Sequence, residues 1–130
     1  MHERTPSSEA VDQFIQRELD TVPHLEALLL LWGTRPKLWS AAEMGAALYL
    51  KESGGRDILQ NLTRRHLAVR TASELYAYSA DSLELDMLVA ALEREYRRNL
   101  IRVTRMIHGK ASTGVREFAD AFRLKKDREP

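Results

Sequence analysis

The chain has 130 residues, 44% of them hydrophobic and 30% charged, with a net charge of +1, which indicates one ordinary globular domain. It contains no cysteine, which excludes disulfide frameworks and thiolate-ligated zinc sites. The longest apolar run, residues 28–32, is far shorter than the ~20 residues that span a bilayer. The first residues lack the apolar region of a signal peptide. We therefore expect a cytoplasmic protein with no membrane segment.

The N-terminal quarter of the sequence predicts a tail and two helices. Residues 1–7 are polar and are expected to form a flexible tail. Ser8 is a suitable N-cap for a helix over residues 9–19, where apolar side chains recur at helical spacing. Thr21 caps a second helix that ends at Gly33 and is apolar nearly all round, which is typical of a helix at the centre of a small bundle.

The most specific pattern lies between residues 39 and 79. Ser40 and Glu43 form a capping box, which begins one helix by satisfying free backbone N–H groups of its first turn. A second helix is expected over about 53–66. Its predicted buried residues are Ile58, Leu59 and Leu62. Two alternating runs around a polar turn follow, at 67–79, and predict a β-hairpin with Tyr76 and Tyr78 on one face and Val69 and Ala77 on the other.

Two adjacent glycines, Gly54 and Gly55, fall at the start of the second of these helices. Each costs up to about 1 kcal/mol relative to alanine inside a helix, and neither presents a side chain to a ligand. One interpretation is close approach of the backbone to phosphate. The other is a longer turn followed by a shorter helix, and we favour this one.

The C-terminal half predicts one long helix, a linker and a tail. The helix is expected over about 82–108, and its apolar stripe repeats every eleven residues, from Leu85 to Tyr96 to Ile107, which is typical of a nearly straight helix. Residues 110–130 are expected to form a linker, a short amphipathic segment and a charged tail. Residues 8–109 would then form the folded domain.

The order of capped helix, second helix and hairpin resembles the winged helix-turn-helix of bacterial transcription regulators. The segment at 118–124, together with the order of predicted elements before it, is similar to a group of uncharacterised bacterial winged-helix proteins. The resemblance implies a mainly α fold with a small β-hairpin wing, N-terminal helices and a long C-terminal helix. It also implies that the helix at 53–66 reads base edges in the major groove of double-stranded DNA, while the wing at 67–79 touches the flanking backbone or minor groove.

The resemblance assigns candidate DNA-binding roles to polar residues on the exposed face of that helix and on the first wing strand. These candidates are Ser53, Arg56, Gln60, Arg64, Arg65 and Arg70. Arginine pairs with guanine and glutamine with adenine in the major groove, which suits Arg56 and Gln60, whereas the other arginines would neutralise phosphates. Residues 56–70 carry four basic side chains and one acidic side chain, a local positive charge on a nearly neutral protein. Two carboxylates oppose phosphate binding: Asp57 on the helix and Glu74 at the tip of the wing.

The leading hypothesis is a DNA-binding transcription regulator acting as a homodimer. Its expected dimer interface is the stripe of the long helix: Leu85, Leu92, Tyr96, Leu100, Val103 and Ile107. The alternative is a winged-helix module that binds a protein partner and no DNA, through the Tyr76/Tyr78 side, an arginine face of the long helix or the segment containing Phe118 and Phe122. We expect no enzyme, no cofactor and no metal site, because the four histidines are scattered and no catalytic spacing is present.

Overall fold

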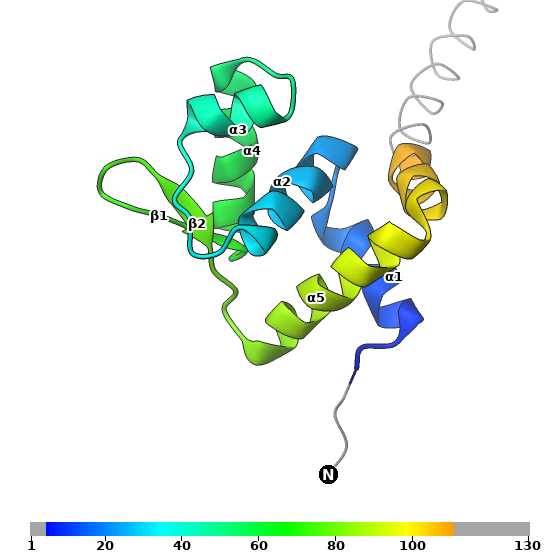
Figure 1. Ribbon diagram of the computed structural model, residues 1–130. Coiled ribbons are helices and arrows are strands. Elements are labelled where there is room, and N and C mark those ends of the chain that lie inside the picture. Colours follow the sequence, from blue (N-terminus) through cyan, green and yellow to red (C-terminus); the bar gives the residue numbers. More distant parts are fainter. Residues whose placement is uncertain (1–4, 111–130) are drawn as a thin grey trace, which may run out of the picture.

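The computed structural model describes residues 5–110, which form a winged helix-turn-helix with additional helices before and after it (Figure 1). The elements are α1 (Ser8–Glu18), α2 (Val22–Gly33), α3 (Ala41–Ala47), α4 (Glu52–Arg64), β1 (Ala68–Arg70), β2 (Tyr76–Tyr78) and α5 (Leu83–Arg98). Residues 100–110 are helical as well. The predicted mainly α fold with a small β-hairpin wing is confirmed. No helix among residues 5–110 is long and apolar enough to cross a membrane.

Side-chain caps begin the helices close to where the sequence predicts. Ser7, one residue before the predicted cap, accepts a hydrogen bond from the N–H of Ala10 and begins α1. Thr21 caps α2 as predicted. The capping box of α3 is complete: the Ser40 hydroxyl accepts from the Glu43 N–H, and the Glu43 carboxylate accepts from the Ser40 N–H, both at 3.0 Å. Each cap satisfies a backbone donor that has no partner within the helix.

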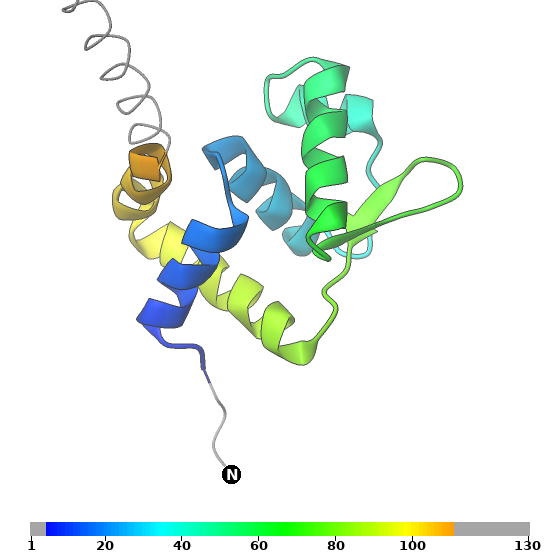
Figure 2. The ribbon, with the colours of Figure 1, turned by 180° about the vertical axis from the view of Figure 1, so that it is seen from behind.

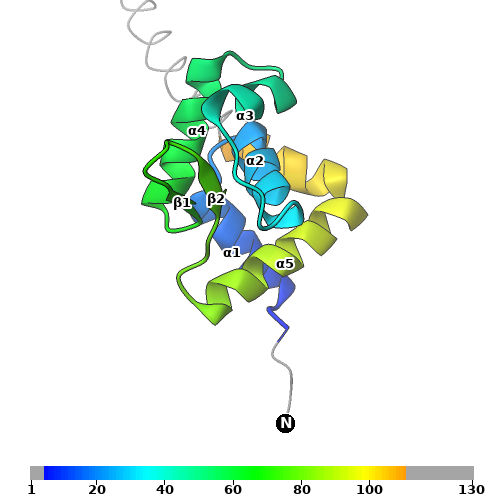
Figure 3. The same cartoon turned by 60° about the vertical axis from the view of Figure 1, so that its left-hand side comes forward.

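The helix α2 forms the centre of the molecule. In Figures 1 and 3 it lies between α3, α4 and the wing on one side and α1 and α5 on the other. Its residues Leu25, Ala27, Leu28 and Leu31 are buried. They join side chains from the helices and the hairpin in one hydrophobic core, so the helix-turn-helix and the flanking helices fold as one unit.

Gly54 and Gly55 both lie inside α4, so the interpretation that they belong to a longer turn before a shorter helix is wrong. A Cβ on Gly55 would stand 2.4 Å from the carbonyl oxygen of Ala41 and 2.5 Å from the nitrogen of Gly45. Both atoms belong to the backbone of α3. The helices α3 and α4 therefore approach so closely that only a residue without a side chain fits at this point. Packing of α4 on α3 compensates for the poor helix propensity of glycine.

The wing is a two-stranded antiparallel hairpin that pairs Ala68 with Tyr78 and Arg70 with Tyr76. The backbone before α3 joins it, because Trp39 and Tyr76 exchange N–H to carbonyl hydrogen bonds of 2.7 and 2.8 Å. Tyr76 is only 3% exposed, whereas Val69 is exposed. The Tyr76 side of the hairpin thus faces the core, and the surface predicted there for a protein partner is not available.

The prediction of a single long helix over 82–108 is wrong, because α5 ends at Arg98 and the chain changes direction at Asn99 (Figure 1). Asn99 has φ −132° and ψ 52°, outside the helical region, and asparagine favours such helix-terminal positions. Beyond it, Arg102 binds Asp12 at 2.9 Å, and the ammonium group of Lys110 donates to carbonyl oxygens at the end of α1. Residues 100–110 therefore fold back onto α1.

Candidate nucleic-acid interface

The helix α4 is strongly amphipathic. Its inner face, formed by Gly55, Ile58, Leu59 and Leu62, is buried against α3 and the core. Its outer face is polar and exposed, and it carries four of the predicted DNA-binding residues: Ser53, Arg56, Gln60 and Arg64. Figure 2 shows α4 in front of α3, with no other element over its outer side and with the wing beside its C-terminal end.

The two arginines on this outer face differ in their partners. Arg56 donates to the carboxylate of Glu52 at 2.6 Å, one turn earlier on the same helix, and both side chains are exposed. An exposed pair of this kind contributes only about 0.3–0.5 kcal/mol, so Arg56 can exchange Glu52 for an anionic ligand at little cost. Arg64 makes no ion pair within residues 5–110 and is exposed. Asp57 lies on the same face and lowers its positive charge.

Arg65, predicted as a phosphate contact, has a different environment from the other candidates. Its guanidinium group donates to the carboxylate of Glu18 at 2.9 Å, to that of Asp20 at 3.2 Å and to the carbonyl oxygen of Arg17 at 3.0 Å. Its Nε donates to Asn61. Arg65 thus connects the end of α4 to the end of α1, with most of its N–H donors already used, and it positions α4 rather than extending the exposed face.

The end of α4 leads directly into the wing through a left-handed residue, His66 (φ 64°). The N–H of Leu67 donates to the carbonyl oxygen of Leu62 at 2.9 Å, and that of His66 donates to Thr63 at 3.1 Å. This pattern is a common helix C-terminal closure, the Schellman motif. The His66 ring also lies 3.0 Å from the carboxylate of Asp81. These contacts fix the direction in which β1 leaves α4.

The wing tip carries little net charge. Arg70, at the end of β1, pairs with Glu74 at 2.7 Å, and both side chains are exposed. The turn is closed by the N–H of Thr71, which donates to the carbonyl oxygen of Leu75 at 2.7 Å. Arg70 is therefore accessible, as predicted, but its charge is balanced by Glu74.

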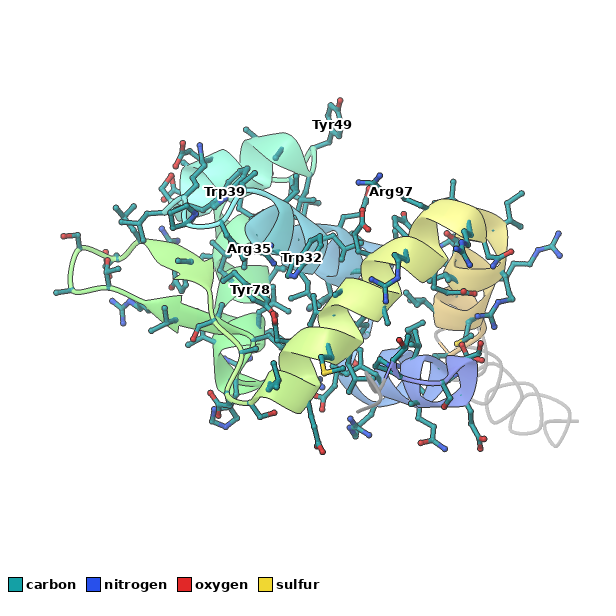
Figure 4. The ribbon with its side chains drawn as sticks, turned by 60° about the horizontal axis from the view of Figure 1, so that its bottom comes forward. Trp32, Arg35, Trp39, Tyr49, Tyr78 and Arg97 are labelled. Atoms are coloured by element: carbon teal, nitrogen blue, oxygen red, sulfur yellow. The ribbon has the colours of Figure 1, made fainter. Side chains whose placement is uncertain are left out.

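A cation–π cluster, which the sequence did not predict, fixes the wing to the rest of the fold (Figure 4). The Arg35 guanidinium lies 4.3 Å from the ring centroid of Trp32 and 5.7 Å from that of Tyr78. The hydroxyl of Tyr78 donates to Asp86 at 2.6 Å. Burial, together with this hydrogen bond, raises the pKa of Tyr78 well above its usual value. The wing is thereby joined to α2 and to α5, the helix that carries Asp86.

The six residues predicted for the dimer interface are divided by the fold. Leu92, Val103 and Ile107 are buried in the core of their own chain, and Leu85 and Tyr96 are partly buried against it. Leu100 alone is exposed, at 51%, beside Ile101, which is 66% exposed. The break at Asn99 is the reason, because it turns the second half of the stripe toward α1.

Catalytic or metal-binding groups were not expected. Within residues 5–110 no group of three or more histidine, aspartate or glutamate side chains is placed to hold a metal ion. The Phe118/Phe122 segment lies outside the described residues. The predicted DNA-binding residues that the structure brings together are those on the outer face of α4.

Several solved structures are similar in fold. RV1404 from Mycobacterium tuberculosis is 17% identical over 94% of this chain and 86% of its own, with a TM-score of 0.51. The MarR family transcription regulator SP03579 is 22% identical over 95% of this chain and 84% of its own, with a TM-score of 0.49. MepR, a transcription regulator of the Staphylococcus aureus multidrug efflux pump MepA, is 13% identical over 88% of either chain, with a TM-score of 0.48.

At these identities the likeness to solved structures concerns the fold alone. No family model matches the sequence, and no curated protein matches it significantly. The predicted resemblance to winged helix-turn-helix regulators is thus confirmed at the level of the fold. The function has to be argued from the site, because one fold supports many functions.

Proposed function

We propose that this protein is a DNA-binding transcription regulator that reads duplex DNA with α4 and places its wing against the flanking backbone. The observation that supports the proposal is the outer face of α4, where Arg56, Gln60 and Arg64 are exposed on a helix whose inner face is fixed by close packing on α3. The major groove of B-DNA is wide enough to admit an α-helix.

Three exposed side chains of this face have a chemical role in the proposed complex. Arg56 releases Glu52 and donates to a guanine or a phosphate, and Gln60 bonds an adenine edge. Arg64, at the other end of the helix, neutralises a phosphate. Arg65 is not part of the contact set, because most of its donors are engaged at the end of α1 and at Asp20 just beyond it. The neutral wing tip and Asp57 keep the affinity for non-specific DNA modest.

Fluorescence anisotropy of a labelled mixed-sequence duplex, titrated with the protein at two salt concentrations, tests this function. We expect binding at low salt that weakens steeply as salt rises, because each neutralised phosphate releases counterions. Binding that is absent at about 50 mM salt would contradict the proposal, since that is where phosphate contacts are strong. The alternative hypothesis, a winged-helix module that binds a protein partner, would then be favoured.

That alternative has little support within residues 5–110. Tyr76 is buried, and Tyr78 is half-buried and held by Arg35 and Asp86, so this side of the wing offers little exposed aromatic surface. Of the other two predicted partner sites, the arginine face of the long helix is interrupted where α5 ends at Arg98, and the segment with Phe118 and Phe122 lies outside the described residues. The exposed face of α4 favours DNA over a protein partner, because it is polar and charged, whereas the buried cores of protein interfaces are depleted of charged residues.

We also propose that the protein acts as a homodimer, joined near the break between α5 and the following helical segment. Leu100 and Ile101 are adjacent, exposed and apolar, and no element of the described chain covers them. A two-fold dimer would present two α4 helices to half-sites about 34–36 Å apart on the DNA.

Sedimentation equilibrium tests the dimer directly. We expect the unsubstituted chain to sediment as a dimer and the double variant Leu100→Glu/Ile101→Glu to sediment as a monomer, because two buried carboxylates would be desolvated at the interface. Leu83→Glu, a matched change at an exposed leucine on the first turn of α5, should leave the dimer intact. A monomeric unsubstituted chain would refute the dimer and leave the DNA proposal standing.

A further inference from the structure

The turn between α3 and α4 contains a strained aromatic residue. Tyr49 has φ 59°, in the left-handed region. Its N–H donates to the carbonyl oxygen of Ala46 at 3.3 Å, and the N–H of Leu50 donates to that of Gly45 at 2.7 Å. This closure of a helix normally places glycine or asparagine at the left-handed position. A tyrosine is unfavourable there, because its Cβ crowds the backbone carbonyl oxygen.

The fold receives no compensation from the Tyr49 side chain. The residue is 96% exposed, and its side chain makes no hydrogen bond or ring contact with residues 5–110. Figure 4 shows the ring pointing away from the body of the molecule. Glycine at this position would close the same turn without strain. Residues 5–110 thus provide no benefit that favours tyrosine over glycine here, which points to a partner outside them.

The position of Tyr49 in the fold indicates what that partner is. The residue lies two positions before Lys51, the exposed N-terminal cap residue of α4. In a helix-turn-helix, the N-terminal end of the second helix is the end that enters the major groove. A tyrosine just before that end is placed at the rim of the groove, where phosphates line both sides.

The backbone of the turn is also held firmly against α4. A Cβ on Gly54 would lie 3.2 Å from the Cβ of Leu50, which shows that the Leu50 side chain sits directly on the first turn of α4. Leu50 thus anchors the turn to α4, and Tyr49, the preceding residue, keeps a fixed position relative to the outer face of the helix. A backbone that is already ordered loses less conformational freedom when the residue binds a ligand.

We propose that Tyr49 is a contact to the DNA backbone: its hydroxyl donates to a phosphate oxygen at the rim of the groove that α4 enters, while Lys51 neutralises a neighbouring phosphate. This inference rests on the proposed function. Tyrosine hydroxyls are among the groups that bind phosphate oxygens in protein–DNA complexes. Because the contact is uncharged and not to a base, it strengthens binding equally for all sequences and leaves the salt dependence unchanged.

Two substitutions separate binding from folding. Tyr49→Phe keeps the ring and the strained backbone but loses the hydroxyl, and it should weaken binding of a labelled mixed-sequence duplex about tenfold, with an unchanged melting temperature. Tyr49→Gly removes the ring and the strain, and it should weaken binding at least as much while leaving the melting temperature equal or higher. Leu83→Ala, at another exposed apolar residue, should change neither quantity.

Salt titrations of the same variants provide a second readout. The slope of log affinity against log salt should stay unchanged in Tyr49→Phe and should fall by about 0.9 in Lys51→Ala. Duplex affinity that is equal for the unsubstituted chain and both Tyr49 variants would overturn the inference while leaving the proposed function intact. A lower melting temperature for Tyr49→Gly would also overturn it, because the tyrosine would then support the fold. Absence of DNA binding by the unsubstituted chain would overturn both.

Discussion

Replacing Gly55 by alanine is expected to destabilise the folded protein by about 3 kcal/mol, which corresponds to a fall of about 10 °C in melting temperature. The added methyl group would meet backbone atoms of α3 at 2.4 and 2.5 Å, and backbone cannot rotate away as a side chain can. Alanine improves helix propensity by about 1 kcal/mol, which offsets only part of this clash. The helices α3 and α4 would have to separate, and their shared core would loosen.

Gly54→Ala is the matched control for this prediction, since it makes the same chemical change at the next position of the same helix. The nearest atoms to its added methyl group belong to the side chain of Leu50, at 3.2 Å or more, and this side chain can move slightly. We expect a change in stability of less than about 1 kcal/mol, of either sign. Equal melting temperatures for Gly54→Ala and Gly55→Ala would show that the close approach of α3 to α4 is not real. Differential scanning calorimetry measures both variants.

The second large effect is expected in DNA binding. The double variant Arg56→Ala/Arg64→Ala should bind duplex DNA about 100-fold more weakly, because two charge-assisted contacts of at least 1.4 kcal/mol each are lost. Its stability should hardly change, since Arg56 makes only an exposed pair with Glu52 and Arg64 makes no ion pair within residues 5–110. Fluorescence anisotropy gives the affinities, and thermal unfolding confirms that the fold is intact.

A matched control for the arginine pair is available on α5. Arg97 pairs with Glu93 one turn before it, as Arg56 pairs with Glu52, and Arg98 is exposed beside it. Figure 4 shows Arg97 on α5, the helix beyond Trp32 and Tyr78. Arg97→Ala/Arg98→Ala removes the same charge from the protein, and we expect less than about a threefold loss of affinity from weaker long-range attraction. If both double variants bound equally weakly, net charge rather than the face of α4 would account for binding.

Local signals explain why much of the fold could be predicted from the sequence. The capping box at Ser40 and Glu43 fixes the start of α3 because both hydrogen bonds form within one turn. The spacing of Ile58, Leu59 and Leu62 identifies the inner face of α4, and so its outer face with Arg56 and Gln60. These features depend on neighbouring residues only, so no knowledge of the tertiary structure is needed to predict them.

Features that depend on distant contacts were predicted wrongly. Both faces of the hairpin carry apolar residues, so alternation alone could not show that pairing with Trp39 directs Tyr76 inward. The apolar stripe continues unbroken past Asn99, and only the contacts of residues 100–110 with α1 reveal the break. Gly55 is unfavourable on propensity alone, and its use becomes clear only when α3 is in place beside it.

The candidate site shows the same division. Ser53, Arg56, Gln60 and Arg64 share one face because they are spaced along a single helix, so the sequence could group them. The role of Arg65 could not be predicted, because Glu18 and Asp20 are more than forty positions away in the chain. The proposed contact at Tyr49 could not be predicted for another reason: a left-handed tyrosine has no sequence signal, since the usual residue at that position is glycine.

The salt dependence of duplex binding, measured in parallel for the unsubstituted chain and for the two double-arginine variants, tests the central claim most directly. If α4 neutralises phosphate, the slope of log affinity against log salt should fall by at least about 0.9 in Arg56→Ala/Arg64→Ala. It should stay the same in Arg97→Ala/Arg98→Ala. Identical slopes for the unsubstituted chain and Arg56→Ala/Arg64→Ala would contradict the assignment of α4 as the DNA-contacting helix.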